Sequence, residues 1–376
     1  MANINSIQQF FSFIDCDFQC FDMGRIIRPL DAQTLHELEQ THIPCAAPFL
    51  QHIWLAILFW PAQKEPVGNS PERHNSPEQH NVWFLKLPLD EQARLNLAAR
   101  DEFLHRLLDA LNQKPDSSAS AGSLNTLENV MQDNPYGFQP RPEQLANFHA
   151  LAYQHLNLPS SRYYAPAQTF FSGQDHFKHW QALGFQGLAD FAAHLNESYQ
   201  HKSNIQWLSE SVSSIPAAPF LALSQCLENH SVSETFCQAV FQRANNELQN
   251  HSDSQSTAQL CAASIRATAC CACPEQAGYF IRQVLKSSVH NDIEILAIIS
   301  GRCWPQLKQY ETLMPFLESL TQTEHGQQAF NAVLSDLMFI PGMREPVLQA
   351  FRSPERSEQL SQAIGTFFSS LQQVRQ

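Results

Sequence analysis

Two stretches of large apolar residues, HIWLAILFW at 52–60 and NVWFLKLPL at 81–89, decide the fold of the first part of the chain. Both are rich in the aromatic and β-branched side chains that favour strands, and both are short for a helix. Residues 61–80 between them are polar and rich in Pro, Asn and Glu, which is typical of a loop. We therefore predict an antiparallel hairpin whose long tip tolerates change.

The residues on either side of this hairpin complete a small domain. FQCFDMGRIIRPL at 18–30 predicts two short strands joined by a turn. Asp31 is placed to cap a helix after the second strand, and Asp90 is placed to cap an amphipathic helix over 91–111. We therefore predict an α+β N-terminal domain with a small antiparallel sheet over residues 1–111.

The rest of the chain is predicted to be helical. From residue 142 onward apolar residues recur at three- and four-residue spacing, which indicates helices and no sheet. Paired helices give a period of roughly 35–45 residues, the range of HEAT-like arrays, although no residue pattern repeats with it. We expect residues 142–376 to form either an irregular HEAT-like α-solenoid or a helical bundle. Residues 112–141 are small, polar and turn-rich, and they are predicted to be a linker and junction.

The composition limits the classes of function. The 376 residues include 23 Lys and Arg against 36 Asp and Glu, and the net charge of −13 disfavours nucleic acid as a partner. The uninterrupted apolar run at 53–60 is far shorter than the roughly 20 residues that cross a membrane. The first residues also lack the basic region and cleavage site of a signal peptide. We therefore expect a cytoplasmic protein that does not enter membranes.

The cysteines are interpreted as packing residues. Four of the ten, Cys261, Cys270, Cys271 and Cys273, fall in QLCAASIRATACCAC at 259–273, which reads as one Ala-rich helix. We expect these four thiols to be reduced, mostly buried and free of metal. The sequence contains no G-x-S-x-G, G-x-G-x-x-G or Walker loop. We therefore expect no cofactor and no metal.

Six charged residues of the first domain are the candidate ligand-binding residues: Asp22, Arg25, Lys86, Asp90, Arg100 and Asp101. Lys86 stands in a strand of large hydrophobic residues, on the face opposite Leu85 and Leu87. Burying an unpaired lysine is costly, so it either faces solvent or pairs with Asp22 or Asp101. A paired lysine would be either a structural ion pair or part of a site for a polar ligand.

Six strings of the chain are distinctive: FDMGR (21–25), HIWLAILFW (52–60), WFLKLPLDEQ (83–92), AARDEFL (98–104), NPYGFQP (134–140) and LGFQGLADF (183–191). Together they resemble an uncharacterised proteobacterial family of domains of unknown function, DUF3549. The resemblance extends in register from about residue 18 to 195, and the helical remainder fits in length and character. It implies a bacterial, intracellular protein with this two-part architecture, and it supplies no catalytic residue, ligand or partner.

Two classes of function remain open. The first is a non-enzymatic interaction or scaffold protein, in which the helical surface and the N-terminal sheet domain bind a protein partner or a second copy of the chain. The second is a small-ligand-binding protein or enzyme with a site around Asp22, Arg25 and Lys86. A pocket that converges on these three residues would favour the second class. Charges spread over a flat sheet face would favour the first.

Overall fold

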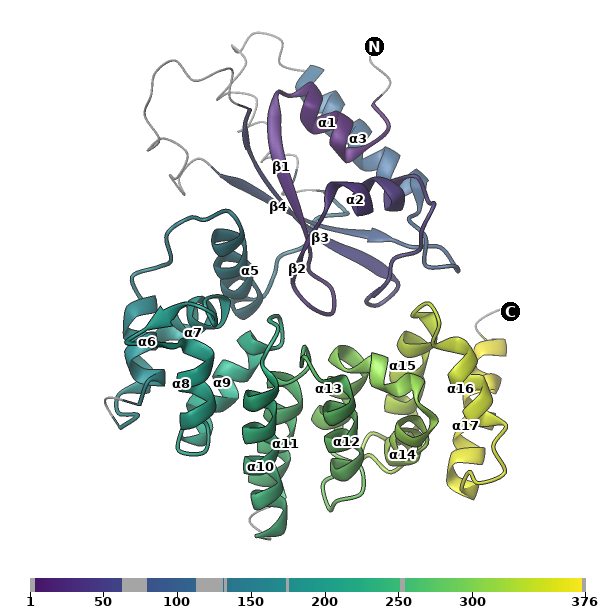
Figure 1. Ribbon diagram of the computed structural model, residues 1–376. Helices are drawn as coiled ribbons and strands as arrows, with labels where there is room; N and C mark the ends of the chain where they lie inside the picture. Colours follow the sequence, from purple (N-terminus) through teal and green to yellow (C-terminus); the bar gives the residue numbers. More distant parts are fainter. Residues whose placement is uncertain are drawn as a thin grey trace. The chain divides into compact units, whose positions relative to one another are not determined.

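The computed structural model describes residues 4–62, 80–112, 131, 134–173, 176–250 and 254–373 (Figure 1). The chain forms two compact units. The first consists of Met1–Phe148 and His155–Pro159, and the second of His149–Gln154 and Ser160–Gln376. Most of the predicted loop 61–80 and much of the predicted linker 112–141 lie outside the described residues. The domain limits drawn from the sequence stay a prediction.

A four-stranded antiparallel sheet with the order β2-β1-β3-β4 forms the centre of the first unit. The strands are β1 (Cys16–Asp22), β2 (Arg28–Leu30), β3 (His52–Pro61) and β4 (Asn81–Pro88). Strands β3 and β4 pair with Trp54 opposite Lys86 and Leu55 opposite Leu85, which confirms the predicted hairpin. The predicted α+β fold with a small antiparallel sheet is confirmed as well.

One face of this sheet carries the main hydrophobic core of the unit. Side chains alternate along a strand, so every second residue of β3 and β4 shares this face. Those residues are Ile53, Leu55, Ile57, Phe59, Trp83, Leu85 and Leu87. Helices α1 (Ile7–Phe13), α2 (Ala32–Glu39) and α3 (Leu97–Asn112) cover the face (Figure 1). Asp31 caps helix α2 as predicted, because its carboxylate accepts a hydrogen bond from the Thr34 N–H at 2.8 Å.

Aromatic side chains cover part of the opposite face. Phe148, from helix α5 (Pro142–His155), meets Phe21 and Phe84 edge to face, with ring centroids 5.3 and 5.5 Å apart. Phe138 meets Trp54 and Phe84 in the same way, at 4.8 and 5.7 Å. The central strand β3 is therefore buried on both faces along much of its length, which explains why its sequence is continuously apolar instead of alternating.

The segment NPYGFQP at 134–140 covers part of the outer edge of β4. The Lys86 N–H donates a hydrogen bond to the Tyr136 carbonyl at 2.8 Å, and the Phe138 N–H donates one to the Phe84 carbonyl at 3.1 Å. An open strand edge invites pairing with other chains, and these two bonds occupy it locally. At the other edge of the sheet, β2 has only three residues, one of them a proline.

The second unit is helical, and helices two apart in the chain pack against each other. Its helices are α6 (Tyr164–Phe171), α7 (Gly184–Ala193), α8 (Asn204–Ser211), α9 (Ala217–Leu227), α10 (Glu234–Gln249), α11 (Ser254–Ala267), α12 (Pro274–Val284), α13 (Ile293–Arg302), α14 (Tyr310–Thr321), α15 (Gly326–Phe339), α16 (Arg344–Phe351) and α17 (Glu358–Gln373), with short 3₁₀ helices at Trp180–Ala182 and Trp304–Lys308. Helix α7 packs on α9, α9 on α11, and α11 on α13. In the same way α8 packs on α10, and α12 on α14 (Figure 1).

Two features of this unit differ from the sequence prediction. Residues 142–376 are not free of sheet, because β5 (Ser198–Tyr199) and β6 (Lys202–Ser203) form a two-stranded hairpin. Gln200 and His201 both have positive φ, which suits the tight turn between twisted strands. The helix expected through the cysteine cluster ends early, at Ala267. After it the backbone bonds elsewhere: the Ala272 N–H donates to the Val232 carbonyl at 3.2 Å, and Cys271 forms a bridge with Val232.

Candidate functional site

Asp22 and Arg25 lie at the end of β1 and in the loop that follows, both buried. The Asp22 carboxylate accepts a hydrogen bond from the Gly24 N–H at 2.9 Å and lies 3.4 Å from the Arg28 guanidinium. Burial raises the pKa of Asp22, and these two contacts oppose the rise. The Arg25 Nε–H donates to the Pro48 carbonyl at 2.8 Å. The contacts hold the loop between β1 and β2 in place.

Lys86 lies on the other face of the sheet. It pairs with Trp54, whereas Asp22 pairs with Leu55, the next residue along β3. Because successive side chains of a strand point to opposite faces, Asp22 and Lys86 do not converge. The Lys86 ammonium lies 5.9 Å from the centre of a Trp54 ring, a cation–π contact on a partly exposed surface. The expected opposite orientation of Lys86 and Leu85 is confirmed.

The remaining three candidates stabilise local structure. The helix expected from residue 91 begins later, at Leu97, and Asp90 instead closes the turn before it by accepting from the Arg94 N–H at 2.9 Å. Arg100 is buried on α3 and donates to the Glu39 carbonyl at 2.7 Å and to the Asp101 carboxylate at 2.6 Å. The six candidates therefore do not all converge on one site, because Asp22 and Lys86 lie on opposite faces of the sheet. Their role in binding a ligand stays a prediction.

The four clustered cysteines do not share one helix, contrary to the prediction. Cys261 is buried on α11, whereas Cys270, Cys271 and Cys273 follow the end of that helix and are partly exposed. Cys270 and Cys273 have the C-x-x-C spacing of many zinc sites, yet one bonds to a backbone carbonyl and the other to a glutamate. Among the residues that the structure describes, no group of three or more His, Cys, Asp or Glu is arranged to hold a metal ion.

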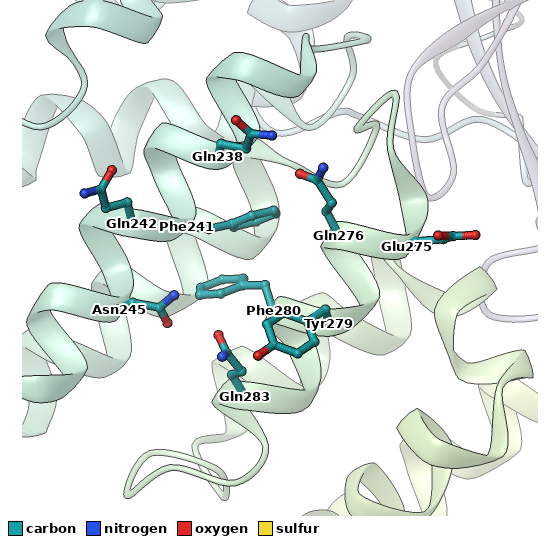
Figure 2. A pocket seen from close by; sticks show the side chains of 9 residues that line it. All are labelled: Gln238, Phe241, Gln242, Asn245, Glu275, Gln276, Tyr279, Phe280 and Gln283. Carbon is teal, nitrogen blue, oxygen red and sulfur yellow. The ribbon is translucent and has the colours of Figure 1, made fainter.

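A groove between α10 and α12 is the main candidate site (Figure 2). Its volume is about 550 Å³. Helix α10 contributes Gln238, Phe241, Gln242 and Asn245, and helix α12 contributes Glu275, Gln276, Tyr279, Phe280 and Gln283. Most of these residues recur every three or four positions, so each helix turns one stripe of side chains toward the groove.

Both helices begin at residues that the sequence marks as helix starts. The Ser233 hydroxyl accepts a hydrogen bond from the Phe236 N–H at 3.3 Å, and Pro274 is the first residue of α12. The floor of the groove is a stacked aromatic pair. The rings of Phe241 and Phe280 lie 4.5 Å apart with an interplanar angle of 23°.

The rim of the groove is made of carboxamides. Five of its nine lining residues are Gln or Asn, and only one is charged. At one end, Gln238 and Gln276 both donate to the Glu234 carboxylate, at 3.1 and 2.5 Å, whereas Asn245 and Gln283 lie toward the other end (Figure 2). The groove therefore combines an apolar floor with a rim of uncharged groups that both donate and accept hydrogen bonds.

Comparison with known protein families assigns the chain as a whole. The family described as protein of unknown function (DUF3549) matches residues 2–368. The chain belongs to the DUF3549 family. No curated protein and no solved structure matches it. Within the described ranges of this DUF3549 protein, no helix is both long and apolar enough to span a bilayer.

Three of the strings that indicated the DUF3549 family contribute to the fold of this chain. FDMGR forms the end of β1 and the Asp22 turn, and AARDEFL carries the buried Arg100. In LGFQGLADF, the Gly187 backbone approaches Tyr163 so closely that a Cβ there would lie 2.8 Å from the Tyr163 carbonyl oxygen. None of these strings lines the α10–α12 groove. Sequence reasoning missed the groove, whose only local signal is the spacing of amides on α10 and α12.

Proposed function

We propose that this protein is a non-enzymatic interaction protein, and that the α10–α12 groove binds an extended peptide segment of a protein partner. The observation that carries the proposal is the amide rim over the Phe241–Phe280 stack. A carboxamide offers both an N–H donor and a C=O acceptor, as does each residue of an extended peptide backbone. An extended segment has unpaired backbone groups, which the rim amides can satisfy while one apolar side chain rests on the aromatic floor.

Charge complementarity gives the partner segment a preference for basic residues. Glu275 is the one charged residue that lines the groove, and Glu234 lies beside the Gln238–Gln276 end. The whole chain carries a net charge of −13. A Lys or Arg of the segment near Glu275 and Glu234 gains from both effects, whereas an acidic residue there is repelled.

The proposal extends to the arrangement of the helices around the groove. We propose that the second unit is an irregular HEAT-like α-solenoid, supported by the packing of α7, α9, α11 and α13 in succession. Such an array offers a long surface along which a partner segment can continue beyond the groove. The N-terminal sheet domain is proposed as a further contact surface, for a partner or for a second copy, in a cytoplasmic bacterial protein.

A small-ligand or enzyme function around Asp22, Arg25 and Lys86 is the second candidate. It ranks below peptide binding because Asp22 and Lys86 point to opposite faces of the sheet. The polar groups of Asp22 and Arg25 are moreover engaged by the surrounding loop.

The test is a selection of phage-displayed random peptides on the immobilised full chain. Selected peptides are then labelled and titrated by fluorescence polarisation against the parent and against Gln242→Ala, Asn245→Ala and Gln283→Ala. Losing one uncharged hydrogen bond costs about 0.5–1.5 kcal/mol, so each substitution should raise Kd about 2- to 13-fold. Asn246→Ala is the matched control, because Asn246 is exposed on α10 but does not line the groove.

Peptides that pair a basic with an apolar residue and lose affinity only for the three rim variants support the proposal. Selection of no peptide would contradict it. So would peptides that bind all four variants as tightly as the parent, because their site would then lie elsewhere.

A further inference from the structure

Three thiols gather at the Gln238–Gln276 end of the groove. Cys237 precedes Gln238 on α10, whereas Cys271 and Cys273 lie in the short segment that leads into α12. The Cys237 thiol hydrogen-bonds to the Cys271 sulfur. The Cys271 sulfur also accepts the Cys273 N–H at 3.3 Å, and its thiol donates to the Cys273 carbonyl at 3.5 Å. The backbone holds the segment against α10, because Cys271 forms a bridge with Val232, just before that helix.

The surroundings distinguish the three sulfurs chemically. The hydrogen bonds from Cys237 and from the Cys273 N–H lower the pKa of the Cys271 thiol, although burial opposes this. A hydrogen bond to Glu234 and burial raise the pKa of Cys273. The hydrogen bond with Cys271 and burial raise the pKa of Cys237. Because the thiolate is the reactive form, Cys271 is the nucleophile of the cluster.

The solvent exposure of the two thiols supports the same assignment, with Cys271 as the thiol that reacts first. Cys271 is partly exposed, so a small oxidant can reach it from solvent. Cys237 is fully buried and hydrogen-bonds to Cys271. A reactive, accessible thiol with a second thiol in contact is the arrangement in which an oxidised sulfur is captured as a disulfide.

We propose that Cys237 and Cys271 are a peroxide-sensitive thiol pair that closes to a disulfide. The Cys271 thiolate attacks one oxygen of hydrogen peroxide, the O–O bond breaks, and after protonation of the leaving hydroxide the products are Cys271 sulfenic acid and water. The Cys237 sulfur then attacks the sulfenic sulfur, and its proton leaves with the hydroxyl as a second water. Two thiols lose two electrons in total, and one peroxide is reduced to two waters.

The disulfide would also act on the groove, and this part rests on the proposed function. Bond formation brings the two sulfurs to about 2 Å, closer than any hydrogen-bonded pair of thiols. It therefore draws the start of α12, with Gln276, toward Gln238 on α10. We expect the narrowed end to weaken binding of an extended peptide.

The experiment treats the reduced full chain with hydrogen peroxide, alkylates the remaining thiols and maps the cysteines by fragment-ion mass spectrometry. The expected product is a Cys237–Cys271 link. Cys271→Ser should abolish it, whereas Cys237→Ser should leave a sulfenic acid at Cys271 that dimedone traps. The matched control is Cys226→Ser, at a buried thiol whose pKa is raised, and it should form the link like the parent.

Failure to form this link, or first oxidation at Cys273 or Cys226, would overturn the proposal whatever the groove binds. A second reading compares the affinity of one phage-selected peptide for the reduced and oxidised chains. A loss of affinity on oxidation that Cys237→Ser abolishes supports the coupling to the groove. Equal affinity for both forms overturns that coupling while the thiol chemistry stands.

Discussion

Replacing Trp83 tests how the sheet of the first unit is stabilised. The indole of Trp83 is 3% exposed and lies among Phe59, Phe11 and Phe10, with ring centroids 4.7, 5.5 and 6.1 Å away. Trp83→Ala removes the side chain from the centre of this aromatic cluster and leaves a cavity. Large-to-small substitutions of this kind cost about 3–5 kcal/mol, because lost burial and the cavity add.

This loss of stability can be measured as a decrease in melting temperature. For a unit of roughly 150 residues, 1 kcal/mol corresponds to about 2–4 °C, so Trp83→Ala should melt about 6–20 °C below the parent. The assay is scanning calorimetry of the full chain, following the transition of the first unit. Trp83→Phe should stay close to the parent. The indole N–H has no partner among the described residues, and removing it offsets the smaller volume.

Trp54→Ala is the comparison that makes the result decisive. Trp54 lies on the other face, is partly exposed, and donates its N–H to the Phe49 carbonyl at 2.8 Å. Its removal should cost less than that of Trp83. If Trp83→Ala melts within about 2 °C of the parent, a change worth no more than about 1 kcal/mol, the assignment of the core to this face is refuted.

Two further predictions concern single residues. Burial raises the pKa of Glu39 to about 7 from 4.5, so the free energy of unfolding should fall as the pH rises between these values. In denaturant titrations, the free energy of unfolding of Glu39→Gln should not fall over this pH range, and at pH 8 it should exceed that of the parent by up to about 3 kcal/mol. The same pH profile for Glu39→Gln and the parent would contradict this. Gly187→Ala should lose about 1–3 kcal/mol in thermal unfolding, because its Cβ would meet the Tyr163 carbonyl. Gly365→Ala, with open space around it on α17, should be neutral or stabilising, and equal losses for both would refute the reasoning.

The hairpin was predictable because its signal is local. Eight consecutive apolar residues, 53–60, next to a polar loop leave few alternatives, and pairing with a second largely apolar stretch satisfies the backbone of both. The starts of α10 and α12 were predictable for the same reason. Ser233 caps α10 and Pro274 is the first residue of α12, so each signal lies next to the helix that it starts.

Other elements depend on contacts that the sequence does not display. The sequence does not reveal helix α6, because Pro166 stands in its first turn and its residues are mostly apolar or aromatic. The pattern at 174–183 indicates a helix, yet His176, Phe177 and His179 have φ of 49°, 57° and 61°, which interrupts it. Left-handed conformation at such residues has no local sequence signal.

The site depends on register and on packing between helices. Asp22 and Lys86 both lie in segments that the sequence predicts as strands. Only the pairing of β1 and β4 with β3 shows that the two side chains face opposite ways. In the sequence, the amides of α10 cannot be distinguished from those of an ordinary solvent-exposed helix face. They become a rim because α12 places a second row of amides across the Phe241–Phe280 stack.

The central claim is that the groove recognises the backbone of an extended peptide, and a double-mutant cycle on that backbone tests it most directly. One phage-selected peptide is compared with analogues in which a single backbone amide is replaced by an ester, which removes one N–H donor and keeps every side chain. Each is titrated by fluorescence polarisation against the parent and against Gln242→Ala, Asn245→Ala and Gln283→Ala. We expect at least one ester to weaken binding to the parent by about 2- to 13-fold and to have little further effect on the matching variant. Esters that bind the parent as tightly as the amide peptide, or that lose equally on every variant, would contradict the claim.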